Sequence, residues 1–78
     1  MSSIVHHYYK KSFDGLLILV QLNPAELTGV ELIIDSNGHT VKTNRQYDSE
    51  IYGDLEEDDF VTANALEFNL YLKGLVNT

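Results

Sequence analysis

The chain has 78 residues, of which 44% are hydrophobic and 22% charged, with no cysteine and a formal net charge of −7. This composition predicts a single globular domain over residues 1–78 and excludes disulfides and thiolate zinc sites as sources of stability. We expect a cytoplasmic protein with no membrane segment, because the first residues do not resemble a signal peptide and the longest apolar run, Leu16 to Val20, is too short to span a bilayer.

Two turn dipeptides organise the first half of the chain. Asp14-Gly15 predicts a two-residue hairpin turn between strands over residues 4–13 and 16–23. In that register one face pairs Phe13 with Leu16 and continues to Tyr9 and Leu22, and we expect it to be the core face. The opposite face also carries apolar residues, namely Tyr8, Leu17 and Leu19.

The second dipeptide, Asn37-Gly38, predicts another two-residue turn, between strands over residues 30–36 and 39–47. This register would place Ile34 opposite Val41 and Leu32 opposite Thr43. The segment between the hairpins contains Pro24, which cannot donate a hydrogen bond to a strand and therefore indicates a connection.

Acidic residues gather in the next segment, which we expect to be an exposed acidic loop. Seven of the twelve acids lie there: Asp48, Glu50, Asp54, Glu56, Glu57, Asp58 and Asp59. The other five acids balance the five Lys and Arg residues, so the whole charge excess belongs to this loop. Such a surface repels nucleic acid, so we expect no nucleic-acid partner.

The C-terminal third matches two templates. Leu66, Phe68, Leu70 and Leu72 alternate with polar residues, which predicts a strand. Val61, Ala65, Phe68, Leu72 and Leu75 also follow helical spacing, with Asp58 or Asp59 as the cap. We favour the strand, because the helix would leave Leu66 and Leu70 on its polar side. The sequence therefore predicts an all-β fold of about five antiparallel strands, as a small barrel or sandwich built on two hairpins. The alternative is an α+β fold with a C-terminal helix packed on the hairpins.

Candidate chemistry is sparse. The acidic loop offers carboxylates for a cation or small ligand, but it lacks the alternating acids and central glycine of a calcium-binding EF-hand loop. His6 and His7 would point to opposite faces of a strand, so they cannot hold one ion together. No serine lies in a nucleophile motif, and no phosphate-binding loop is present. We therefore expect no enzyme, no cofactor and no metal site.

The remaining interpretation is a non-enzymatic protein-interaction domain. Apolar Leu17 and Leu19 beside Tyr8 on the second face of the first hairpin indicate that a second layer or another chain covers them. So short a chain has little material for a second layer, so we expect a homo-oligomer with these three residues at its interface. The acidic loop suggests two alternatives, a binder of a cation or small ligand and an acidic inhibitor or adaptor of a basic protein.

Overall fold

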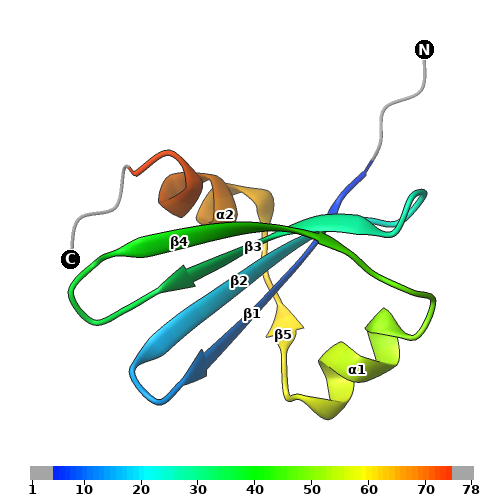
Figure 1. The fold of residues 1–78 in the computed structure, drawn as a ribbon, viewed down its shortest axis with the longest axis horizontal. Helices are drawn as coiled ribbons and strands as arrows, with labels where there is room; N and C mark the ends of the chain where they lie inside the picture. Colours follow the sequence, from blue (N-terminus) through cyan, green and yellow to red (C-terminus); the bar gives the residue numbers. More distant parts are fainter. Residues whose placement is uncertain (1–4, 75–78) are drawn as a thin grey trace.

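The computed structural model describes residues 5–74, which form one antiparallel sheet with two short helices (Figure 1). In chain order the elements are β1 (His7–Phe13), β2 (Leu16–Asn23), β3 (Thr28–Ile34), β4 (Thr40–Gln46), α1 (Ile51–Glu57), β5 (Val61–Thr62) and α2 (Ala65–Leu72). The strand order is β4-β3-β2-β1-β5, which confirms the five antiparallel strands. The sheet stays open with β4 and β5 at its edges, so the predicted barrel or sandwich is wrong, and the fold is the mixed α+β alternative.

The first hairpin has the predicted register. Phe13 pairs with Leu16, Tyr9 with Val20 and His7 with Leu22. Asp14 and Gly15 both have positive φ angles, 52° and 79°, as a two-residue type I′ turn requires. The turn dipeptide therefore determined both the hairpin and the face of each side chain.

The second hairpin differs from its predicted register by one residue. Ile34 pairs with Thr40 and Ile33 with Val41, so Val41 lies on the opposite face from the one expected. The reason is the loop, which Asp35 closes by accepting hydrogen bonds from the backbone N–H groups of Asn37 and His39, both at 2.9 Å. These hydrogen bonds hold the pKa of the Asp35 carboxyl below its usual value, and the one from the His39 N–H has the largest effect. The loop thereby gains one residue, and only Gly38 of the Asn37-Gly38 pair has a positive φ.

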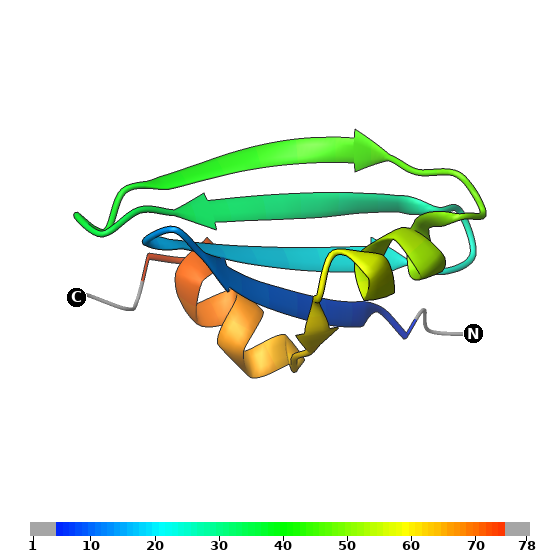
Figure 2. The ribbon, with the colours of Figure 1, turned by 90° about the horizontal axis from the view of Figure 1, so that it is seen from below.

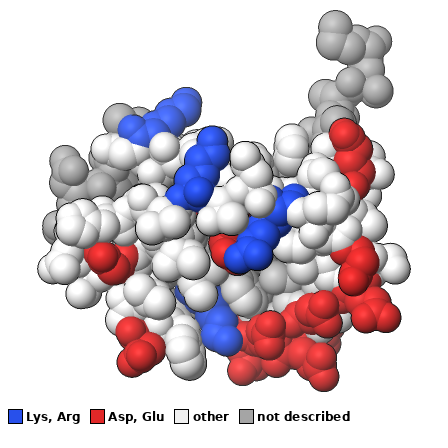
Figure 3. Space-filling model, viewed as in Figure 1, with Lys and Arg blue, Asp and Glu red and all other residues white. Residues whose placement is uncertain are grey.

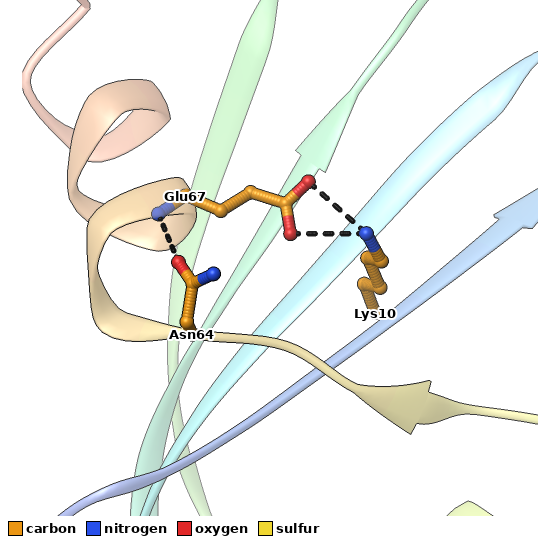
Figure 4. A network of polar contacts seen from close by, with 3 residues as sticks. All are labelled: Lys10, Asn64 and Glu67. Atoms are coloured by element: carbon orange, nitrogen blue, oxygen red, sulfur yellow. Dashed lines mark hydrogen bonds and ion pairs between the residues drawn. The ribbon is translucent and has the colours of Figure 1, made fainter.

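The last element is helix α2 and not the predicted strand. Its N-cap is Asn64, whose side chain accepts a 2.8 Å hydrogen bond from the Glu67 N–H, while Gly74 follows the helix with a φ of 68° (Figure 4). The helix buries Phe68 completely and leaves Leu66 70% exposed. Phe68 packs against Leu19, Leu32 and Ile34 of the sheet, and burial of a side chain of this size contributes about 1.5–3 kcal/mol.

Part of the predicted acidic loop is also helical, as α1. Asp59 has a φ of 65° and ends this helix, with its N–H donating to the Glu56 carbonyl and the Phe60 N–H donating to the Leu55 carbonyl. This is the hydrogen-bond pattern of a Schellman motif, which returns the chain toward the sheet and starts β5.

The two helices cover opposite faces of the sheet. Leu19 and Leu32 pack with Phe68 of α2, whereas Leu22 packs with Ile51 and Leu55 of α1. Positions 19 and 22 of one strand differ by an odd number, so they point to opposite sides. Figures 1 and 2 show that α2 and α1 also lie toward opposite ends of the strands. Each helix therefore covers only part of its own face, α2 toward one end of the strands and α1 toward the other. No helix among residues 5–74 has the length and apolar character needed to cross a membrane.

Candidate interaction surface

Apolar side chains form a continuous patch on the part of the α1 face that α1 does not reach. We call it the bare face; it consists of Phe13, Leu16, Ile18, Ile33 and Val41. Its members are neighbours across four strands, because Phe13 pairs with Leu16, Ile18 with Ile33, and Ile33 with Val41. Phe13 is 59% and Val41 60% exposed, and none of the five belongs to either buried cluster. Leu16, Ile18 and Ile33 are partly buried and connect the two exposed residues, and a contiguous apolar surface of this kind is typical of an interaction site.

The acidic segment, residues 48–59, lies on the same face as the bare face. All seven of its acids are exposed, and Figure 3 shows the acidic side chains crowded over α1 while basic ones are scattered over the rest of the view. The helix is attached through its buried residues Ile51 and Leu55 and through Tyr52, whose hydroxyl lies 3.3 Å from Nδ1 of His7. The sheet therefore presents an apolar area and an anionic area side by side.

Lys11 and Phe60 connect these two areas. The Lys11 Nζ lies 5.2 Å from the centre of the Phe13 ring and 5.8 Å from that of Phe60, within the range of cation–π attraction. An open cleft of about 450 Å³ runs along the same edge, and its lining residues are Lys10, Lys11, Ser12, Phe13, Asp59 and Val61. A partner that contacts Phe13 therefore also reaches the carboxylate at the end of α1.

The carboxylates do not form a ligand set for a metal ion. Within residues 5–74 no three Asp, Glu or His side chains come close enough together to hold one ion. The histidines are likewise separated: His7 contacts Tyr52, and His39 lies 3.5 Å from the carboxylate of Asp35. In this part of the chain the acids therefore form a spread negative surface.

The three residues predicted at an oligomer interface lie under or beside α2. Leu19 has no exposed surface, and Leu17 and Tyr8 are partly buried against the Phe68 cluster. The Tyr8 hydroxyl accepts a 3.0 Å hydrogen bond from the Gln21 side chain. Helix α2 is a second layer from the same chain that covers these residues. Their apolar character therefore does not by itself require contact with another chain.

The sequence interpretation missed the bare face, because it assigned those residues to the core. Phe13, Leu16 and Ile18 were placed on the expected core face, and the one-residue error in the second hairpin placed Val41 opposite Ile34. Lys11 is the residue that indicates an open face. It lies beside Ile18 on that face, and a lysine is almost never fully buried in a core unless it is paired.

Comparison with protein-family models, curated proteins and solved structures finds no match to this chain.

Proposed function

We propose that this chain is a non-enzymatic protein-interaction module that binds a basic protein through the bare face and the neighbouring acidic segment. The observation that carries the proposal is the position of exposed Phe13 and Val41 on the same face as the charge excess. Apolar contacts supply affinity, and the carboxylates select a partner with Lys and Arg around its own apolar residues. The absence of cysteine suits a reducing compartment, so we place this interaction in the cytoplasm.

The charges of α1 support a role in binding because they do not favour folding. The end of the helix carries Glu56, Glu57 and Asp58, and its last turn has no basic residue. The C-terminal end of a helix is the negative end of its dipole, so acids there destabilise it. A residue that lowers the stability of its own helix is typical of a functional surface.

The exposure of the seven acids supports a non-enzymatic role. An exposed carboxylate is poorly suited to act as a general acid.

The experiment compares Val41→Ser with Leu66→Ser as immobilised full-length chains in a native extract. Leu66 is a control outside the proposed surface: it is 70% exposed and lies in α2, which packs on the opposite face of the sheet from Val41. The wild type and Leu66→Ser should retain the same basic protein, and Val41→Ser should bind it about tenfold more weakly, the loss expected for one valine contact.

Glu56→Gln combined with Glu57→Gln should weaken the same complex, and about 0.5 M salt should dissociate most of it, because exposed charges are screened at that concentration. Retention that is equal for Val41→Ser and Leu66→Ser would exclude the bare face as the binding site. If the protein retained is acidic, or if salt leaves the complex intact, the charge part of the proposal is wrong.

A further inference from the structure

Among residues 5–74, β4 is the long edge of the sheet that no further strand covers. It pairs with β3 on one side only, whereas β5 covers part of the opposite edge of the sheet. Six of its seven residues are exposed, and Thr43 alone is partly buried. A row of unpaired backbone groups of this length is a template for another strand.

The hydrogen-bond pattern shows which backbone groups of β4 are free. Asp35 donates its N–H to the His39 carbonyl, and Tyr47 donates its N–H to the Leu27 carbonyl. Hydrogen-bonded pairs alternate along an antiparallel ladder, so residues 41, 43 and 45 bond to β3. Residues 40, 42, 44 and 46 therefore direct both their N–H and C=O groups outward.

From this we infer that β4 pairs antiparallel with β4 of a second copy of this chain, in the register that places Thr43 opposite Thr43. This register pairs residue 42 with 44 and residue 40 with 46 of the other copy, so all four outward residues on each side are used. The product is one continuous sheet of ten strands, five from each copy. The inference goes beyond the proposed function, since it uses the backbone edge of β4 in place of the side chains of the bare face, and a second copy of this chain as the partner.

Charge and hydrogen bonding favour this register over its two neighbours. Lys42 faces Asn44 of the second copy, and Arg45, already paired with Glu31 at 3.1 Å, faces Val41. One neighbouring register would set Lys42 directly opposite Lys42, and like charges in that position destabilise a strand pair. The other would set Asn44 opposite Asn44 and would pair only three of the four outward residues of β4.

The position of the acidic segment also favours edge pairing. The segment begins directly after β4, so antiparallel pairing sends the two segments to opposite ends of the shared edge. They are then separated by about the length of the strand, roughly 20 Å, which exceeds the Debye length of about 8 Å at physiological salt. Edge pairing therefore keeps the two acidic segments apart, although each chain carries a net charge of −7.

The test is sedimentation equilibrium of the full chain up to about 1 mM, where a weak interface is populated. Asn44→Glu sets a carboxylate opposite Lys42 of the other copy twice per dimer and should tighten dimerisation by about two- to thirtyfold. Asn44→Lys should weaken it by a similar factor. Net charge alone predicts the reverse order, because Asn44→Glu makes the chain more negative and Asn44→Lys makes it less so.

A second measurement tests the backbone directly. The N–H groups of Lys42 and Asn44 should gain protection from hydrogen exchange as the protein concentration rises, while those of residues 41, 43 and 45 stay protected throughout. Asn44→Pro removes an outward N–H that β3 does not use, so the monomer should fold and the dimer should be lost. A strict monomer at every concentration, or affinities in the order of net charge, would overturn the inference. Neither result bears on the binding of a basic protein at the bare face.

Discussion

Tyr47 is the residue that joins β4 to the acidic segment. Its N–H donates to the Leu27 carbonyl at 2.7 Å and its ring packs into the Ile51 and Leu55 cluster. The ring also lies over Gly29, where an added Cβ would lie 2.7 Å from a ring carbon. The Tyr47 hydroxyl is buried and has no hydrogen-bond partner among residues 5–74. Burial raises the pKa of this phenol, with Glu31 acting in the same direction.

The raised pKa predicts a loss of stability in alkaline solution. An unfolded tyrosine titrates near pH 10, so above about pH 10 the unfolded state has lost a proton that the folded state still holds. The free energy of unfolding then falls as the pH rises, while below that pH the contribution is complete. Urea unfolding at about pH 9 to 11 should show a shallower fall for Tyr47→Phe than for the wild type. Tyr9, whose pKa is raised mainly by burial, contributes a fall in the same direction. Equal slopes for the two proteins would contradict this assignment.

At the scale of the element, α1 is a helix with an unfavourable charge arrangement. Its first turn contains Asp54, where an acid stabilises the dipole, and its last turn contains no base. Glu57→Lys should therefore raise the free energy of unfolding by about 0.5 kcal/mol and the melting temperature by about 2–4 °C. Asp54→Lys makes the same change in net charge at the other end of the helix and should lower stability. If both variants raise the melting temperature equally, net charge and not the helix dipole controls it.

Helix α2 explains why the sequence predicted some elements and not others. The first hairpin was predictable because Asp14-Gly15 alone sets its turn and register. The strand template for residues 65–73 depended on the alternation of apolar and polar residues. That alternation is also compatible with α2, because the helix buries only Phe68 of the apolar set. The deciding signals were Asn64 followed by Glu67, an N-cap pattern, and Gly74 after the last turn. The ion pair between Lys10 and Glu67, at 3.2 Å, adds a contact between distant segments that no local pattern contains (Figure 4).

The candidate surface was predictable only in part. The acidic segment could be read from composition, because its charge excess is a property of the sequence. The bare face could not, since Phe13 and Val41 are left exposed because α1 covers one end of the sheet and leaves the other open. In the second hairpin, two hydrogen bonds to the Asp35 side chain were enough to move Val41 to this face. The exposure of a strand residue therefore depends on loops and helices distant from it in the sequence.

For the whole molecule, the concentration of seven acids within residues 48–59 predicts opposite effects of salt on folding and on binding. Like charges in the segment repel one another in the folded state, and salt screens this repulsion. The ion pairs that salt would also weaken, Lys10 with Glu67 and Arg45 with Glu31, are partly exposed and each is worth at most about 1 kcal/mol. Raising sodium chloride from about 0.05 to 0.5 M should therefore raise the melting temperature by a few degrees.

The identity of the cation distinguishes screening from a bound ion. At constant ionic strength, replacing part of the sodium by about 2 mM calcium should leave the melting temperature unchanged if the carboxylates act only as a spread negative surface. A rise specific to calcium would favour the cation-binding alternative, because a ligand held only by the folded state stabilises it by mass action.

The same sodium chloride series should weaken the complex with a basic protein while it stabilises the fold, because the acids repel one another within the chain and attract the partner. A melting temperature that falls with salt would show that attractive ion pairs, and not the repulsion within the acidic segment, dominate the electrostatics of the folded state.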